Sequence, residues 1–292
     1  MQPTSQPFPN KEIPSLPPDY AILPLSYPED TTSYLATLKE IFGNDPSQIY
    51  LNSNIKNPAT MPLREHMRLA RFKNNFEGLT PESEGFDTIH LKLVHLPTGA
   101  IAGASIWQLP SSSSSSSTTT KTTTTTAVPS APPKNPYPLL PANATIPPED
   151  SALSTLGPAI DAAMETIVSS IPQLGPAATR NRKWWYLNTL GIAPAHQGKR
   201  LGQYLVHWGI ERAVADAVTR PELDIKGVWV SATEAGVKTY ENAGFERVKT
   251  VRCVYGDEQG GLGMRFDSGD GNGIVGNEEM GGQDYVVLVR EF

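Results

Sequence analysis

Apolar positions in the first hundred residues switch between strand-like and helix-like spacing. A short apolar run at residues 20–25 contains Pro24, and it predicts an edge strand because proline cannot donate to a sheet ladder. A helix is expected to start after residues 28–31, because the apolar side chains that follow recur at three- and four-residue intervals. These side chains are Tyr34, Leu35, Leu38, Ile41 and Phe42. Asp45-Pro46 ends this helix, and residues 61–72 predict a second one.

Two further apolar runs, residues 88–96 and 100–107, predict a β-hairpin. The residues between them, Pro97-Thr98-Gly99, are typical of a hairpin turn. His90 and His95 lie on this hairpin. We expect both to be ordinary strand residues, since no carboxylate or cysteine stands at metal-ligand spacing from them.

The chain changes character between about residues 110 and 150. Serine and threonine runs are followed there by closely spaced prolines, and such a composition buries too little apolar surface to offset the entropy of ordering. Residues 1–19 are also rich in proline and polar residues, which indicates a disordered leader. We therefore expect one domain over residues 20–292, interrupted by a disordered insertion at about 110–150. A linker between two domains is the alternative, but the part before it is small for a separate core.

The second half of the chain repeats a strand–helix–strand order. Residues 152–171 predict a helix, and residues 184–192 predict a buried strand that Pro194 ends. Amphipathic spacing from Leu201 onward predicts a long helix. Beyond it, the patterns predict a strand at 225–231, a helix at 236–242, strands at 247–255 and 284–292, and a glycine-rich loop at 256–283. This order is typical of an α/β domain.

The turn between the strand at 184–192 and the following helix carries the clearest chemistry. It reads Gln197-Gly198-Lys199-Arg200-Leu201-Gly202 and contains two cations. The N-terminus of a helix offers free backbone N–H groups and the positive end of the helix dipole. A turn of this kind predicts a site for an anion such as a pyrophosphate.

Charge and composition exclude several classes of function. The net charge is −6, which argues against a nucleic-acid-binding protein that relies on bulk electrostatics. Cys253 is the single cysteine, so neither an internal disulfide nor a cysteine zinc cluster can form, and no metal is expected. No apolar run reaches membrane-spanning length and no secretory signal is evident. We expect a cytoplasmic protein without nucleic-acid or membrane partners.

Two segments at matching separation resemble the signatures of the GNAT family, the Gcn5-related N-acetyltransferases. The first runs from Leu190 to Gly202 (LGIAPAHQGKRLG), and the second runs from Ser231 to Phe245 (SATEAGVKTYENAGF). The resemblance is good over residues 184–292 and weak over residues 20–109. It implies the GNAT acyl-CoA N-acyltransferase fold, an α/β fold with a central mixed, mostly antiparallel sheet flanked by helices. It also implies acetyl-CoA as the cosubstrate.

The resemblance implies a role for each part of the first signature. The backbone of Leu190, Gly191 and Ile192 would run along the pantetheine arm of acetyl-CoA. The pyrophosphate would be cradled by Gln197, Gly198, Lys199, Arg200, Leu201 and Gly202. The family usually has glycine where Arg200 stands. With a negative φ the guanidinium could help to hold a phosphate, whereas a positive φ would strain an arginine.

The second signature places Tyr240 where the family has its general acid. A phenol can protonate a leaving thiolate because the two groups have similar pKa values; packing alone is the other role for this side chain. Alternation along the strand at 184–192 puts Tyr186, Asn188 and Leu190 on one face, but none of them is an obvious base. Glu234 is a base candidate, although a helix N-terminal carboxylate is the commoner role. A chain of water molecules is the further alternative.

The function expected from this resemblance is acetyl transfer from acetyl-CoA to a primary amine of a small molecule. The amine would attack the thioester directly, without a covalent enzyme intermediate. Two alternatives stay open: transfer to protein lysine or N-terminal amines, and binding of acyl-CoA without turnover. The sequence predicts neither the oligomeric state nor the identity of the acceptor.

Overall fold

The computed structural model describes residues 15–46, 49, 52, 55–76, 86–110, 145, 147, 150, 164–255, 264–267 and 282–292. In chain order, their strands and longer helices are β1 (Tyr20–Pro24), α1 (Thr31–Phe42), α3 (Thr60–Phe76), β2 (Phe86–His95), β3 (Ala100–Pro110), α5 (Ala177–Lys183), β4 (Trp184–Ile192), α6 (Leu201–Thr219), β5 (Gly227–Thr233), α7 (Glu234–Asn242), β6 (Glu246–Tyr255), β7 (Met264–Asp267) and β8 (Gly282–Glu291). Short 3₁₀ helices lie at Pro194–His196 and Pro221–Leu223.

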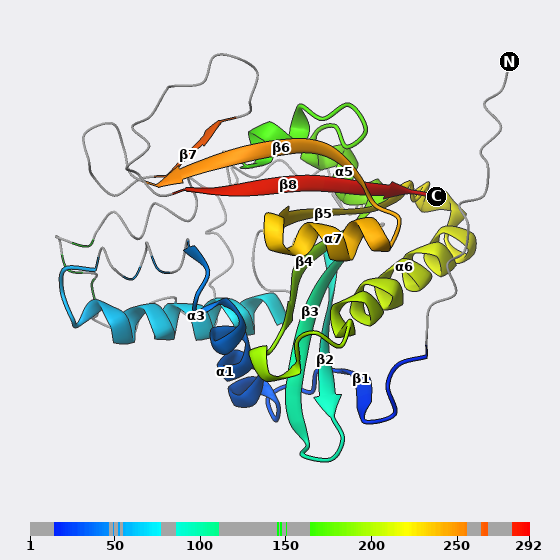
Figure 1. Cartoon of the computed structure of the whole chain (residues 1–292). Helices are drawn as coiled ribbons and strands as arrows, with labels where there is room; N and C mark the ends of the chain where they lie inside the picture. Colours follow the sequence, from blue (N-terminus) through cyan, green and yellow to red (C-terminus); the bar gives the residue numbers. More distant parts are fainter. Residues whose placement is uncertain are drawn as a thin grey trace, which may run out of the picture.

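The strands of the described residues form one eight-stranded sheet in the order β1-β2-β3-β4-β5-β8-β6-β7. Every neighbouring pair is antiparallel except β4 and β5, which run parallel. In Figure 1 the strands β2 to β4 run steeply across the direction of β5, β8 and β6. The mixed, mostly antiparallel sheet flanked by helices that the resemblance implies is therefore confirmed.

Alternation along the strands sends apolar side chains to both faces of the sheet, as expected for strands covered on two sides. One face packs against α6 and α7, which lie side by side (Figure 1). The strand residues of this larger core include Trp107, Trp185, Leu187, Val228, Val230 and Leu288. Their neighbours Trp184, Trp229, Val287 and Val289 point the other way and pack against residues 164–174. Ala104 of β3 lies on that second face too, under Tyr34 and Leu38 of α1.

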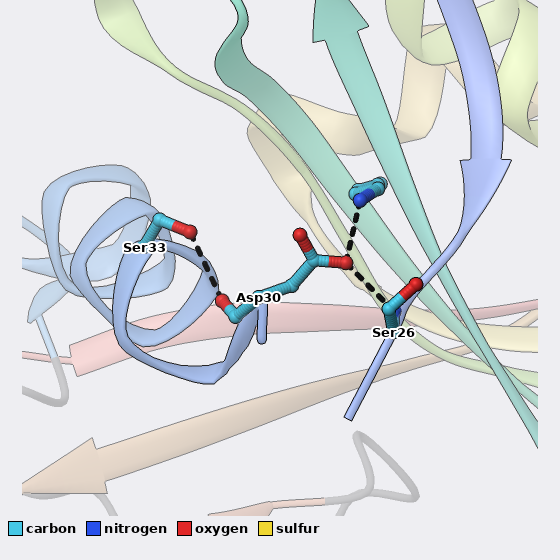
Figure 2. A network of polar contacts seen from close by, with 4 residues as sticks. Ser26, Asp30 and Ser33 are labelled. Carbon is cyan, nitrogen blue, oxygen red and sulfur yellow. Dashed lines mark hydrogen bonds and ion pairs between the residues drawn. The ribbon is translucent and has the colours of Figure 1, made fainter. Parts of the chain in front are cut away.

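A polar network fixes the start of α1 against β2. The Asp30 carboxylate accepts the N–H of Ser26 at 2.7 Å and forms an ion pair with Lys92 of β2, while the Asp30 carbonyl accepts the Ser33 hydroxyl at 3.0 Å (Figure 2). Burial raises the pKa of Asp30, but the bonds from Lys92 and Ser26 outweigh this and hold that pKa below its usual value. This network sets where α1 begins, and so how its other end meets β4.

Most predicted elements match the observed ones to within a few residues. The strand at 100–107 extends to Pro110 as β3, and the helix at 236–242 starts two residues earlier at Glu234. Two differences are larger: the helix α5 was not predicted, and the glycine-rich loop contains β7, which pairs with β6. Of the helix predicted at 152–171, residues 164–169 are helical, while residues 151–163 lie outside the described residues.

The predicted disordered segments are only partly within the described residues. The end of the leader is ordered, because Leu16 packs against the larger core and the Ser15 carbonyl accepts the Tyr204 hydroxyl at 3.1 Å. Residues 1–14 and 111–144 lie outside the described residues. At the end of the predicted insertion, the buried Asp150 carboxylate accepts the Thr60 hydroxyl at 2.6 Å and the Lys56 N–H at 2.8 Å. These bonds tie that end of the insertion to the start of α3.

His90 should make folding stability depend on pH. It is buried on β2, with its ring centroid 5.4 Å from that of Phe72 and 6.4 Å from that of Tyr34. Burial lowers the pKa of His90 from 6.5 to about 4. Below pH 6.5 the unfolded chain takes up a proton that the folded chain excludes, so stability falls as the pH drops toward 4, by roughly 3 kcal/mol in total. Urea unfolding at pH 7, 5.5 and 4 should show this loss in the wild type and a smaller loss in His90→Leu. Equal losses in both would contradict it.

Candidate functional site

The parallel strands β4 and β5 separate toward their carboxyl ends. They pair only where Trp184–Leu187 of β4 meets Gly227–Val230 of β5, although β4 continues to Ile192 and β5 to Thr233. Among the described strands, none pairs with the β5-facing edge of β4 beyond Leu187. The backbone around Leu190, Gly191 and Ile192 is therefore available on that side to an extended ligand.

The turn predicted to bind an anion leads directly from β4 into α6. Gly198 has φ +78°, and residues 197–200 are exposed. The Gln197 side-chain amide donates to the Ile192 carbonyl at 2.9 Å, which fastens the turn to the end of β4. In the described chain, no side chain caps the N-terminus of α6, and its first turn holds no acidic residue. The free N–H groups, the helix dipole and the nearby Lys199 and Arg200 together suit a phosphate group.

Gly202, one of the predicted cofactor residues, lies next to α7, which carries part of the second signature. A Cβ placed on Gly202 would lie 3.6 Å from Thr239 Cγ2 of α7 and 3.9 Å from side-chain carbons of both Ile192 and Leu190. Leu201 beside it is buried in the larger core. The start of α6, the separated end of β4 and the helix that carries Tyr240 therefore lie together.

Arg200 takes the left-handed conformation that the sequence left undecided. It caps α6 with φ +59° and ψ +19°, a region that side chains other than glycine enter at a cost of roughly 1–2 kcal/mol. The arginine therefore strains the turn at the position where the family usually has glycine. Surrounding contacts must hold such a residue in place.

Removing this strain should stabilise the protein without ligand. Arg200→Gly is expected to raise the free energy of unfolding by about 0.5–1 kcal/mol, because relief of the strain exceeds the entropy that glycine adds to the unfolded chain. Arg212→Gly, at an exposed position inside α6, is the matched control and should lower it by about 1 kcal/mol. Urea unfolding of both variants tests this, and a destabilised Arg200→Gly would show that the φ of residue 200 stores no strain.

Tyr240 packs in the larger core with only 6% of its surface exposed. Its ring meets that of Phe245 edge-on, with the centroids 5.8 Å apart. Burial, and to a lesser degree the nearby phenol of Tyr186, raises the pKa of Tyr240 far above its usual value. The hydroxyl is protonated at neutral pH, as an ordinary phenol is. Burial makes it a weaker acid than a free phenol, so the close match to the pKa of a thiol that the sequence suggested is not kept.

The expectation that Tyr186, Asn188 and Leu190 share one face is wrong. The pairing of β3 with β4 shifts register, so that Ile106 pairs with Thr189 but Trp107 pairs with Leu187. Such a bulge inserts a residue and reverses the alternation beyond it. Leu190 accordingly packs against the larger core, whereas Tyr186 lies on the opposite face with Trp229.

Tyr186 instead belongs to an aromatic stack beside the point where β4 and β5 separate. Its ring lies 4.0 Å from that of Trp229 between centroids, at an interplanar angle of 13°. The guanidinium of Arg180 lies 5.1 Å from the centroid of the Trp229 ring.

Glu234, the base candidate, is the first residue of α7. Its side chain is 61% exposed, and its carboxylate lies 3.4 Å from the Arg247 guanidinium, which also pairs with Glu241. An exposed, paired carboxylate at this place favours stabilisation of the helix N-terminus. Nothing in this geometry favours proton abstraction by Glu234.

The end of α1 is a part of the site that sequence reasoning missed. A Cβ on Gly191 would clash with Ile41 and lie 3.2 Å from Phe42 Cζ, so α1 packs directly on the backbone of β4. Three residues later the Asp45 carboxylate accepts the Gln283 side-chain amide of β8 at 3.4 Å. The end of α1 and the residues just after it therefore contact β4 on one side and β8 on the other, near the place where β4 and β5 separate. No local sequence signal connects these distant segments.

Neither a metal site nor a membrane span is found within the described residues. In that part of the chain, no group of three or more His, Cys, Asp or Glu side chains could hold a metal ion. None of the helices described is long and apolar enough to cross a membrane.

Comparisons with known proteins give structural similarity only. Neither the protein-family models nor the curated protein sequences contain a match. Among solved structures, a mosquito arylalkylamine N-acetyltransferase like 5b is 12% identical, with 94% of this chain and 100% of that chain covered and a TM-score of 0.47. A protein of Corynebacterium glutamicum described as histone acetyltransferase HPA2 and related acetyltransferase is 14% identical (94% and 97% covered, TM-score 0.45). NAA60 of Arabidopsis thaliana, solved with acetyl-CoA, is 11% identical (93% and 98% covered, TM-score 0.41). At these values the similarities assign no activity to this chain.

Proposed function

We propose that this chain is an acetyl-CoA-dependent N-acetyltransferase of the GNAT family. The observation that carries the proposal is the meeting of three features: the uncapped N-terminus of α6, the unpaired edge of β4, and Tyr240 on α7. The anion site suits the pyrophosphate of acetyl-CoA, the strand edge suits its extended pantetheine arm, and the protonated phenol suits its thioester. Bound acetyl-CoA supplies an acetyl group activated as a thioester.

The residues of this chain would divide the binding of acetyl-CoA between them. Backbone N–H groups at Gly198 and at the first turn of α6 would bind the pyrophosphate, with Lys199 and Arg200 adding positive charge. The backbone of Leu190, Gly191 and Ile192 would pair with the amides of the pantetheine arm, much as a further strand would.

The chemistry requires few protein groups. A neutral amine attacks the thioester carbonyl carbon, and the N–C bond forms as the C–S bond breaks. Backbone N–H groups on residues 190–192 would stabilise the negative charge that develops on the carbonyl oxygen. Tyr240 would donate its proton to the departing sulfur and recover one from the amine side through solvent. Tyr240 carries its proton at neutral pH, although burial makes it a weaker acid than a free phenol.

We propose a small primary amine as the acceptor. The end of α1 lies across the approach to the thioester, from Phe42 against Gly191 to Asp45 against Gln283. This arrangement supports a compact acceptor over an extended peptide, and the net charge of −6 suits a cationic amine. Transfer to protein lysine or N-terminal amines is the second candidate, and acyl-CoA binding without turnover is the third.

An acceptor screen that detects free thiol tests the proposal. Wild-type protein with acetyl-CoA should release CoA with one or more small primary amines and not with lysine or N-terminal peptides. Longer acyl-CoAs run in parallel show the acyl preference. Thiol release with peptides alone would support the second candidate. Calorimetric binding of acetyl-CoA without thiol release from any amine would leave binding alone as the function.

A further inference from the structure

Tyr20 connects the edge of the sheet to the turn that precedes α6. It is the first residue of β1 and only 6% exposed. Its hydroxyl lies 2.9 Å from Nδ1 of His196 and 2.8 Å from Nζ of Lys199. These two partners stand on either side of Gln197-Gly198, so one hydroxyl holds both sides of the turn.

The sheet itself holds the Tyr20 ring in place. Tyr20 pairs with His95 in the register of β1 and β2, and the two ring centroids are 5.1 Å apart. The His196 ring meets the Tyr20 ring edge-on at 5.8 Å, and the Lys199 ammonium lies 5.4 Å from the Tyr20 ring centroid. The hydroxyl is therefore fixed relative to the sheet, and its two hydrogen bonds restrain the turn that precedes α6.

One arrangement of the protons links all three side chains in this cluster. A lysine ammonium can only donate, so the Tyr20 oxygen accepts from Lys199. The Tyr20 hydroxyl then donates to Nδ1 of His196, which requires a neutral imidazole with its proton on Nε2. Burial, His95 and Lys199 lower the pKa of His196, and Glu40 opposes them only in part. The neutral imidazole is thus the favoured form at neutral pH, and the three side chains form a continuous chain from Lys199 to His196.

We propose that Tyr20 is a positioning residue for acetyl-CoA binding. Its hydroxyl clamps the turn in the shape that directs the N–H groups around Gly198 and Leu201 outward, and it thereby offsets the left-handed strain at Arg200. This inference rests on the proposed function. It assigns a binding role to a β1 residue that lies 176 and 179 positions away from its two partners.

Calorimetric titration with acetyl-CoA tests the clamp. Tyr20→Phe keeps the ring and removes the hydroxyl, and it should raise the Kd about 5- to 10-fold, which corresponds to the net contribution of one ordinary hydrogen bond. The kcat should stay within twofold. The matched control is Tyr204→Phe on α6, which removes a hydroxyl that donates to the Ser15 carbonyl; its Kd should equal that of the wild type.

A double-mutant cycle with Arg200→Gly separates clamping from simple contact. Glycine removes the strain, so Tyr20→Phe should raise the Kd less than twofold in that background. Amide exchange of residues 198–202 without ligand should be faster in Tyr20→Phe and return toward that of the wild type in the double variant. An unchanged Kd in Tyr20→Phe, or the same fold-change in both backgrounds, would overturn the clamp. Wild-type protein that fails to bind acetyl-CoA would instead overturn the proposed function, and the role of Tyr20 with it.

Discussion

Replacing Tyr240 with phenylalanine is expected to lower the kcat of acetyl transfer by about 100-fold or more, which is typical for loss of a general acid. The KM for acetyl-CoA should change by less than about threefold, because the binding groups on β4 and the turn stay in place. The ring remains to fill the core beside Phe245, so stability should change little. Steady-state kinetics with an acceptor from the screen, together with urea unfolding, measures both.

The pH profile of the same reaction gives a second test of Tyr240. Burial and the proximity of Tyr186 raise the pKa of Tyr240 above its usual value near 10. Ionisation of Tyr240 should therefore not lower the wild-type rate below pH 10. A kcat in Tyr240→Phe within twofold of the wild type would exclude this phenol as the acid and leave it a packing role.

Gly209→Ala is expected to destabilise the fold strongly for the addition of a single methyl group. Gly209 lies on α6 against the buried indole of Trp107, and a Cβ there would overlap ring atoms Cζ2, Cε2 and Cη2. Trp107 is fully buried and packs against Trp185, so the ring has no free direction in which to move. Overpacking of this kind costs about 1–3 kcal/mol or more, although alanine alone would favour the helix by up to about 1 kcal/mol. We expect a net loss of about 2 kcal/mol.

Gly202→Ala is the matched control for stability. It lies on the same helix, but its Cβ would meet its nearest neighbour at 3.6 Å, an ordinary contact distance. Urea unfolding without ligand should therefore show Gly202→Ala at least as stable as the wild type. If Gly209→Ala proved equally stable, α6 would not pack on Trp107 as described.

The elements around the site could be predicted because their signals are local. The β4 strand, the start of α6 at Leu201 and the glycine after α7 follow from apolar spacing and turn chemistry over a few residues. Two signatures about 40 residues apart suggested that Gly202 and Tyr240 belong to one site; in the structure Gly202 lies beside Thr239, the neighbour of Tyr240.

The rest depended on features that no local pattern contains. The bulge that separates Tyr186 from Leu190 arises from the register between β3 and β4, and alternation alone predicted the wrong face. The φ of Arg200 depends on how the whole turn is held. The contact of Tyr20 with His196 and Lys199, and that of Phe42 with Gly191, join segments far apart in the chain. Such contacts are decided by packing of the complete sheet rather than by propensity.

Quantifying both products of one reaction tests the proposed activity most directly. Wild-type protein, acetyl-CoA and the best amine from the screen should give N-acetylated amine and free CoA in a one-to-one ratio by mass spectrometry. Tyr240→Phe should give the same two products at about one-hundredth of the rate or less. Free CoA without acetylated amine, or no product at all with an enzyme that binds acetyl-CoA, would contradict amine acetylation as the function of this chain.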